Sequence, residues 1–228
     1  DLLVRADRYR ELCLRENKAK LGERRLNLAS PELDGQCEIE LLNVLARPRI
    51  LRMSEELARG PLKSNGYFMN ISEAGEDTTM PWHQDEKFLP EKRPANFDVR
   101  AFTREIPFSQ IQWNLPLLDD AALWIVPGSQ LRDPTGSEIK AMGMDSFDPT
   151  LSGALRVDLR AGDGVVYHNN LIHGLLDTYK RKRRTLHWYW VKQEVHDPYD
   201  LSQVTIPAVL LSKLHPSLVK LTKNASSD

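Results

Sequence analysis

The chain has 228 residues, 41% of them hydrophobic, and its 31 basic and 32 acidic side chains leave a formal net charge of −1. This length suffices for one buried core and is short for two, and the balanced charge gives no field that would attract nucleic acid or an anionic membrane. No apolar stretch approaches the roughly 20 residues that cross a bilayer, and Cys13 and Cys37 show no disulfide or zinc-site spacing, so we expect a cytoplasmic protein acting on a small molecule.

The amino-terminal part, residues 1–65, is predicted to be helical. Apolar side chains recur at helical spacing among charged residues near the start of the chain, and again over about 38–58. Pro48 is expected to break or restart the second of these helices, because proline lacks the N–H that a helix interior needs. Gly60-Pro61 ends it.

From Tyr67 onward, short runs rich in β-branched and aromatic residues alternate with Pro, Gly and Asp clusters, which is typical of strands and turns. Strands are predicted at 66–71, 80–85, 108–115, 123–126, 155–157, 165–167 and 185–191. We therefore expect a mainly β fold with flanking helices, whose core over 66–192 is a double-stranded β-helix, the jelly roll of cupin-like proteins. Residues 193–228 are expected to cap it, so that 1–228 is a single domain, monomeric or weakly dimeric.

The segment Trp82-His83-Gln84-Asp85 puts an imidazole and a carboxylate two residues apart, so on a strand both side chains point the same way. Two imidazoles and one carboxylate on one face of an iron ion leave the opposite positions free for an oxidant and a chelating co-substrate. Taken alone, a His-x-Asp pair is more often a surface pair, because such short motifs are frequent by chance. The second imidazole must come from elsewhere in the chain.

Three blocks resemble, in order and spacing, the phytanoyl-CoA dioxygenase family of iron(II)- and 2-oxoglutarate-dependent oxygenases; they are Met80–Asp85, Leu123–Ser129 and Gly162–Gly174. The resemblance covers roughly residues 67–190 and implies Fe(II), 2-oxoglutarate and dioxygen as cofactor and co-substrates. It implies His83, Asp85 and His173 as the metal ligands. The family interval of eleven residues before an arginine selects His173 over His168, which then has a supporting or structural role.

The same interval selects Arg184 as the residue that binds the distal carboxylate of 2-oxoglutarate through two parallel hydrogen bonds. A register slip of one residue would exchange it with Arg183. Asn70 stands thirteen residues before the first ligand histidine, where the family contacts the 2-oxo acid, although a strand-turn asparagine is the alternative. Gln112 is a further candidate for co-substrate binding; it shares a strand face with Asn114 that faces either the cavity or solvent.

The resemblance implies hydroxylation of an organic small molecule, coupled to decarboxylation of 2-oxoglutarate to succinate. Asp85 argues against halogenation, which needs that ligand position vacated for a halide. Desaturation, cyclisation or epoxidation at the same centre stays open, as does a metal-binding jelly roll without turnover. Leu175 departs from the family, where many relatives carry a hydroxyl side chain that supports co-substrate binding. Cations and aromatic residues after the metal strand either cover the cavity mouth or are merely solvated; they are Lys87, Phe88, Arg93, Arg100, Phe102 and Arg104.

Overall fold

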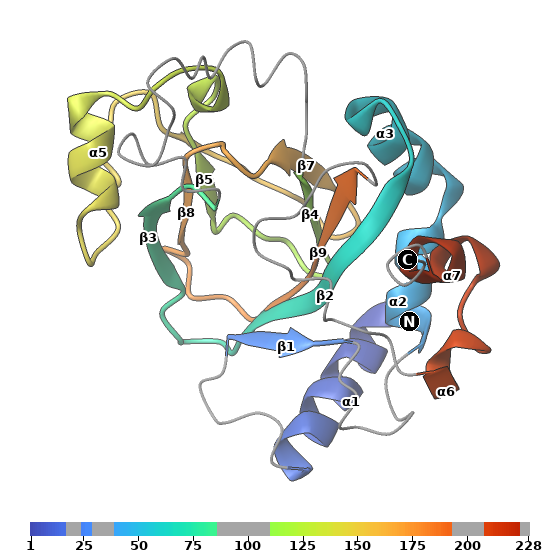
Figure 1. Cartoon of the computed structure of the whole chain (residues 1–228). Helices are drawn as coiled ribbons and strands as arrows, with labels where there is room; N and C mark the ends of the chain where they lie inside the picture. The colour runs from blue at the N-terminus through green and yellow to red at the C-terminus, as the bar shows by residue number, and fades with distance from the viewer. Residues whose placement is uncertain (17–23, 29–38, 86–109, 193–207, 224–228) are drawn as a thin grey trace.

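The computed structural model of the chain describes residues 1–16, 24–28, 39–85, 110–192 and 208–223. Within these residues the strands form two antiparallel sheets, and most of the helices lie on one side of the larger sheet (Figure 1). The larger sheet has the strand order β1-β2-β9-β4-β7 and the smaller one the order β3-β8-β5-β6. This mainly β, two-sheet sandwich with flanking helices is the predicted jelly-roll class.

The elements follow one another with short connections through most of the described chain. The strands are β1 (Arg25–Asn27), β2 (Leu62–Ser72), β3 (Thr79–His83), β4 (Gln110–Pro116), β5 (Leu123–Ile125), β6 (Leu155–Arg156), β7 (Val165–His168), β8 (His173–Leu176) and β9 (Arg183–Lys192). The helices are α1 (Leu2–Arg15), α2 (Ile39–Asn43), α3 (Pro48–Ala58), α5 (Gly136–Met142), α6 (Ala208–Leu211) and α7 (Pro216–Lys223), with 3₁₀ turns η2 (Val44–Ala46) and η4 (Ser129–Leu131).

Each predicted strand is present, with ends shifted by a few residues. The predicted helix over 38–58 is interrupted by η2 and restarts with Pro48 in the first turn of α3, where the missing N–H costs no helical hydrogen bond. Strand β8 and the helix α5 were not predicted, nor was β1, which lies inside the part predicted to be helical. The helices α6 and α7 form the part of the predicted carboxy-terminal cap that the structure describes. No helix among the described residues is long and apolar enough to span a bilayer.

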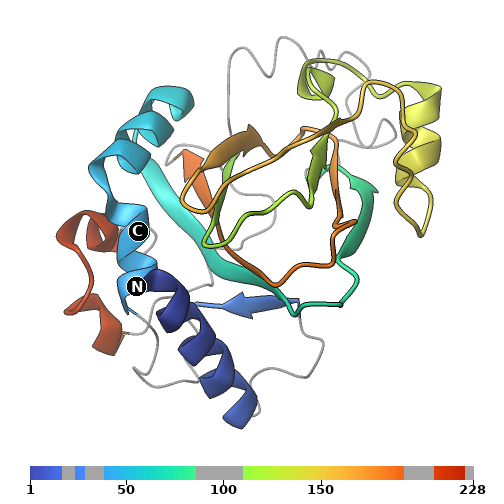
Figure 2. The same cartoon turned by 180° about the vertical axis from the view of Figure 1, so that it is seen from behind.

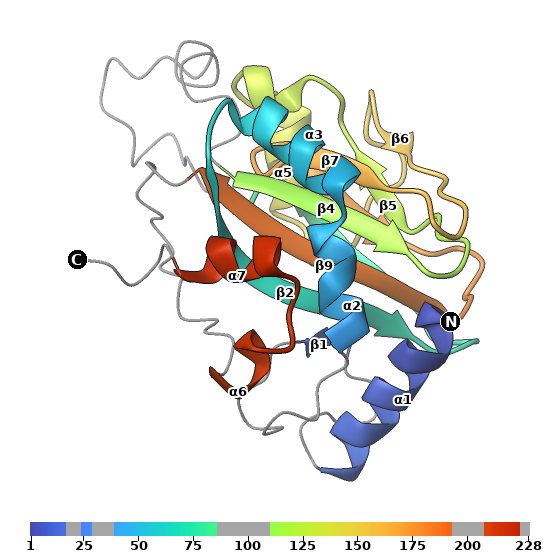
Figure 3. The same cartoon turned by 90° about the vertical axis from the view of Figure 1, so that its right-hand side faces the viewer.

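Strand β9 is buried on both faces, and its side chains alternate between two environments. Leu186, Trp188 and Trp190 point to the helices and belong to the main hydrophobic core. Figure 3 shows α1, α2, α3 and α7 lying over this face of the larger sheet. Trp113 of β4 stacks on Trp188 with ring centroids 5.5 Å apart, and its indole N–H donates to Ser54 of α3 at 2.9 Å. The two tryptophans of β9 are thus core residues.

The opposite face of the larger sheet is polar and looks toward the smaller sheet. Thr185, His187 and Tyr189 alternate with the core residues of β9, and Gln112 and Asn114 do so on β4. All five side chains are buried. Since buried polar groups must be satisfied by partners, the space between the sheets is where a binding site is expected.

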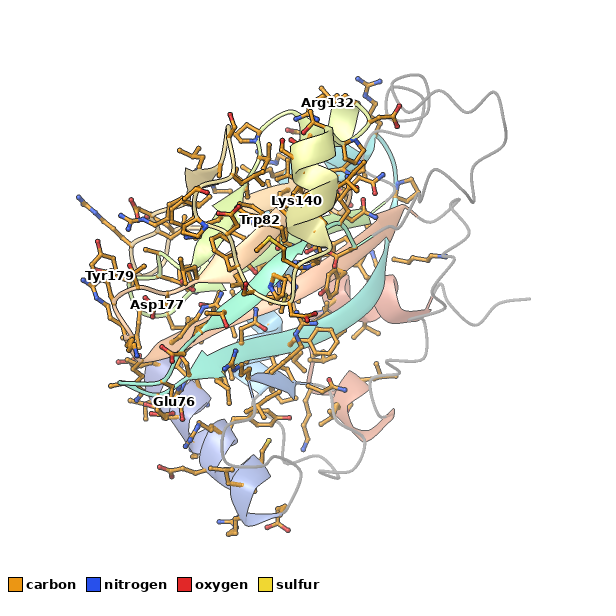
Figure 4. The ribbon with its side chains drawn as sticks, turned by 90° about the vertical axis from the view of Figure 1, so that its left-hand side faces the viewer. Glu76, Trp82, Arg132, Lys140, Asp177 and Tyr179 are labelled. Carbon is orange, nitrogen blue, oxygen red and sulfur yellow. The ribbon has the colours of Figure 1, made fainter. Side chains whose placement is uncertain are left out.

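The smaller sheet is supported from outside by α5 and the loop that follows it, on the side of the molecule away from α1, α2 and α3 (Figure 2). Trp82 of β3 lies beneath α5 (Figure 4), stacks on Phe147 with centroids 4.6 Å apart, and donates from its indole N–H to the Asp148 carbonyl at 2.7 Å. Helix α5 begins with a capping box formed by Thr135 and Glu138. These contacts fix the end of β3, the strand that carries His83.

Candidate metal centre

Three side chains from the adjacent ends of β3 and β8, two neighbouring strands of the smaller sheet, meet in one place. His83 is the last residue of β3 and is the register partner of His173, the first residue of β8. Asp85 follows just beyond β3, and its backbone N–H donates to the Asn169 carbonyl at 3.1 Å. One ligand atom from each of these three residues lies within 4.8 Å of the other two. The strand predicted to run through Asp85 thus ends two residues earlier, yet the carboxylate still reaches the histidines.

Both imidazoles are oriented by backbone carbonyls two residues before them. The Nδ1 atom of His83 lies 2.8 Å from the Pro81 carbonyl, and that of His173 lies 2.8 Å from the Leu171 carbonyl. A carbonyl only accepts, so Nδ1 carries the hydrogen in each neutral ring and Nε2 presents its lone pair. Burial lowers the pKa of His173, which keeps this imidazole neutral at pH 7.

The two free nitrogens face the carboxylate without bonding to it. His83 Nε2 lies 3.6 Å from one oxygen of Asp85, and His173 Nε2 lies 3.5 Å from the other. These separations exceed ordinary hydrogen-bond lengths, and none of the four atoms has a hydrogen to offer when both imidazoles are neutral and the carboxylate is ionised. Three converging electron-pair donors of the two-histidine, one-carboxylate type fit a divalent iron ion.

The candidate metal centre opens into a cavity of about 130 Å³ between the sheets. Asn70 and Gln112, the predicted co-substrate contacts, both line it, and so does Asn114. The amide N–H of Gln112 donates to the Asp85 carboxylate, so this glutamine orients a candidate ligand. The remaining lining residues are Arg25, Met80, His83, Tyr167, His173, Leu175, His187 and Tyr189.

The structure does not bring Arg184 to this cavity. Its side chain is 2% exposed and points to the helical side of the larger sheet, where Nε donates to Asp7 at 2.8 Å and Nη2 to Glu73 at 2.5 Å. The physical reason is the register of β9. Arg184 points to the same face as the core residue Leu186, whereas Thr185 and His187 point to the face that looks toward the smaller sheet. The predicted clamp on the distal carboxylate is therefore not supported by this geometry.

Arg183, the register alternative, also has a partner. Its Nε donates to the buried carboxylate of Asp120 at 2.7 Å, and the hydroxyl of Thr185 donates to the same carboxylate oxygen. Although burial alone would raise the pKa of Asp120, Arg183 and Thr185 lower it below its ordinary value. The aspartate stays ionised and neutralises the guanidinium.

His168 is not part of the centre. It is buried at the end of β7, its Nδ1 accepts from the backbone N–H of Asn170 at 2.9 Å, and burial lowers its pKa to about 4. Leu175, the departure from the family pattern, does line the cavity and supplies an apolar wall. The cations and aromatic residues predicted near the cavity mouth, Lys87, Phe88, Arg93, Arg100, Phe102 and Arg104, lie outside the described residues.

Four polar residues that line the cavity were missed by the sequence reasoning. His187 and Tyr189 could have been found, because they alternate with the apolar residues of the predicted strand 185–191. Tyr167 lies on a predicted strand and within the block Gly162–Gly174, but no role was assigned to it. Arg25 had no signal, since it stands in a short charged segment without strand periodicity.

Solved structures of similar fold support the architecture. AviO1 from Streptomyces viridochromogenes Tue57 is 20% identical with a TM-score of 0.50, covering 76% of this chain and 69% of its own. The ThoJ nickel complex, a non-heme monooxygenase, is 14% identical with a TM-score of 0.55, covering 85% and 68%. EctD from S. alaskensis with bound Fe is 14% identical with a TM-score of 0.51, covering 81% and 65%. At these identities the likeness establishes the fold.

The family is established by sequence. The search of curated proteins gives no match. The model of the phytanoyl-CoA dioxygenase (PhyH) family, in contrast, matches residues 7–175, which is most of the chain and includes His83, Asp85 and His173. The chain therefore belongs to the phytanoyl-CoA dioxygenase family of iron- and 2-oxoglutarate-dependent oxygenases and is an enzyme of that class.

Proposed function

We propose that this enzyme hydroxylates an organic small molecule, using Fe(II), dioxygen and 2-oxoglutarate, which is decarboxylated to succinate. The observation that carries the proposal is the convergence of two lone-pair nitrogens and one carboxylate within 4.8 Å, at the edge of a cavity. His83, Asp85 and His173 are the proposed iron ligands. When bound, iron supplies the activation of dioxygen that no amino-acid side chain provides.

The protein's own residues have three tasks in this proposal. The carbonyls of Pro81 and Leu171 hold the ligand imidazoles in one tautomer, and Gln112 holds the Asp85 carboxylate. The apolar side chains of Met80 and Leu175 limit water at the cavity wall. Exclusion of water suits an oxidation in which the oxidant has to react with the substrate carbon and not in a side reaction.

The outcome of the oxidation depends on where the substrate carbon lies relative to the metal. Asp85 keeps the carboxylate position filled, which argues against halogenation, and hydroxylation is the outcome that the family resemblance implies. Desaturation, cyclisation and epoxidation use the same centre, and mass spectrometry divides the outcomes into two groups: hydroxylation and epoxidation add one oxygen, whereas desaturation and oxidative cyclisation remove two hydrogens.

The test begins without oxygen. Protein loaded with Fe(II) is titrated with 2-oxoglutarate, and a weak visible charge-transfer band is expected. Air is then admitted, and succinate is measured with and without a metabolite extract. Asp85→Ala is expected to lose both the band and succinate formation, whereas Asp158→Ala, which removes an exposed carboxylate paired with Arg156, serves as the matched control and is expected to keep both.

Two results would reject the proposal. Iron-loaded, folded protein that gives no band with 2-oxoglutarate would be a metal-binding jelly roll without turnover. Sustained succinate formation by Asp85→Ala would mean that the ligands are assigned wrongly.

A further inference from the structure

Arg25 stands out among the described residues that line the cavity. It is the one lining side chain with a permanent positive charge, and it has no ion pair with a described carboxylate. Arg183 and Arg184, in contrast, are both neutralised by aspartate or glutamate. Because no described carboxylate offsets its charge, Arg25 can bind an anionic ligand that enters the cavity.

The position of Arg25 is defined by three contacts. It lies on the edge strand β1 as the register partner of Asn70 on β2. Its Nε donates to the Asn70 side-chain oxygen at 3.2 Å, and its guanidinium lies 5.1 Å from the centroid of the Phe68 ring. Its positive charge also acts on Tyr189, where it opposes the rise in pKa that burial causes. The residue is exposed while also lining the cavity, so a ligand can reach it from solvent.

The hydrogen bonds of His187 and Tyr189, which line the same cavity as Arg25, have a defined donor and acceptor at each step. Nδ1 of His187 lies 2.9 Å from the Trp113 carbonyl and therefore carries a hydrogen, so Nε2 accepts from the Tyr189 hydroxyl at 2.8 Å. The Tyr189 hydroxyl therefore turns its hydrogen toward His187 and its lone pairs away from it. Burial lowers the pKa of His187 well below its ordinary value, so the imidazole adds no second positive charge to the cavity. The bond to Asn70 orients the Nε edge of the Arg25 guanidinium, and the terminal N–H groups are left for a ligand.

The charges match a dicarboxylate. Two neutral imidazoles and the Asp85 carboxylate around Fe(II) leave one net positive charge, and Arg25 contributes another. 2-Oxoglutarate carries two negative charges, one on each end. Its 2-oxo acid end chelates metal, so its distal carboxylate needs a cation elsewhere in the same cavity.

We propose that Arg25, on the amino-terminal edge strand, binds the distal carboxylate of 2-oxoglutarate in place of an arginine from β9. In this arrangement Asn70 is a positioning residue: its side-chain oxygen is taken by Arg25, and it acts on the co-substrate through that guanidinium. The inference rests on the proposed function and names the residue that recognises its co-substrate.

Binding of 2-oxoglutarate to the Fe(II)-loaded protein tests this inference without turnover. Under anaerobic conditions, the charge-transfer band gives the Kd for wild type and for Arg25→Gln. A charge-assisted carboxylate contact is lost, so the Kd is expected to rise about 10- to 100-fold. Arg24→Gln is the matched control: it removes the neighbouring cation, which donates to the Thr79 carbonyl at 3.0 Å, and should leave the Kd within about twofold.

A second measurement separates recognition from a structural effect. 2-Oxovalerate carries a methyl group where 2-oxoglutarate has its distal carboxylate, so wild type should bind it much more weakly. In Arg25→Gln this preference should nearly disappear, because the variant weakens only the dicarboxylate. Arg25→Lys keeps the charge but not the planar fork and should retain an intermediate preference. Equal melting temperatures of these variants would show that the fold is intact.

The failures are distinguishable. If Arg25→Gln shows a normal band with wild-type affinity and preference, the assignment of Arg25 is wrong while the oxygenase proposal stands. If Arg183→Gln or Arg184→Gln abolishes the preference instead, the anchor belongs to β9. If wild type shows no band, the proposed function fails and this inference fails with it.

Discussion

Replacing Arg184 with methionine discriminates between the sequence-based and the structure-based role of this residue. In the structure its guanidinium joins three elements: it donates to Asp7 of α1 at 2.8 Å, to Glu73 after β2 at 2.5 Å and to the Ser72 carbonyl at 3.0 Å. Methionine has a similar length and no charge, so it fills the space without making these bonds. We therefore expect Arg184→Met to lower the free energy of unfolding and to leave 2-oxoglutarate binding unchanged.

The size of the loss in unfolding free energy depends on how well water can solvate Asp7 and Glu73 once the guanidinium is gone. Removing one member of a buried ion pair costs about 3–5 kcal/mol, and an exposed pair contributes about 1 kcal/mol or less. Arg184 is 2% exposed, but the side chains of Asp7 and Glu73 are 31% and 35% exposed. Each also keeps a second cation, Lys182 at 2.7 Å and Arg10 at 2.9 Å respectively. An intermediate loss of about 2–3 kcal/mol is expected, equivalent to roughly 4–12 °C in Tm for a chain of this size.

Urea unfolding followed by tryptophan fluorescence measures the stability, and anaerobic titration of the same protein measures the Kd for 2-oxoglutarate. Arg181→Met is the matched control, because Arg181 is exposed and stacks only on Tyr179, so a change below about 0.5 kcal/mol is expected. The reasoning would be refuted by an Arg184→Met protein of wild-type stability that no longer binds 2-oxoglutarate. That result would mean that the family interval, and not the strand register, assigns this guanidinium correctly.

Four further outcomes are expected. Asp120→Asn leaves Arg183 buried without its counter-charge and should cost about 3–5 kcal/mol in urea unfolding. Because the folded-state pKa of Asp120 lies below its ordinary value of 3.8, wild-type stability should be present above about pH 4 and fall as the pH drops through the lowered pKa, and urea midpoints in Asp120→Asn should show less of this dependence. Gln112→Leu removes the donor to Asp85 and should weaken metal affinity about 10- to 100-fold, measured by competition with a chelator; an unchanged affinity would contradict the orienting role. Gly174→Ala puts a Cβ 2.9 Å from an aromatic carbon and 3.0 Å from a backbone oxygen, and should lower Tm by the equivalent of about 1–3 kcal/mol, unless the ring can move aside.

The strands that could be predicted from sequence either have a long alternating pattern or, like the short β5, β6 and β7, are apolar runs beside clusters of Pro, Gly or Asp. Strand β9 has ten residues and alternates fully, whereas β8 is the four-residue segment His-Gly-Leu-Leu and β1 has three residues. Segments this short carry no periodicity, and their strand conformation comes from the neighbours that pair with them. Helix α5 is different: Thr135 and Glu138 form a capping box that the sequence displays, and this signal was overlooked.

The candidate site was predictable where a local motif carries the information. His83 and Asp85 are two residues apart, and the block around His173 has a recognisable pattern, so all three could be named before their geometry was known. The cation proposed to bind the co-substrate could not be named, for two physical reasons. The face that Arg184 occupies depends on a one-residue register, and Arg25 approaches the centre only through its pairing with a strand more than forty residues later.

The direct pairing of His83 with His173 has a consequence for the integrity of the smaller sheet. These residues end one strand and begin its neighbour, and the ladder between the two strands is irregular from Met80 to His83. A cation held by both imidazoles would then cross-link the two strands at the irregular part of their pairing. A free metal concentration of about one hundred times the dissociation constant raises the free energy of unfolding by about 2.7 kcal/mol. This stabilisation would act on the pairing of β3 with β8. Loss of iron would therefore weaken the pairing of β3 with β8 and abolish the activity at the same site.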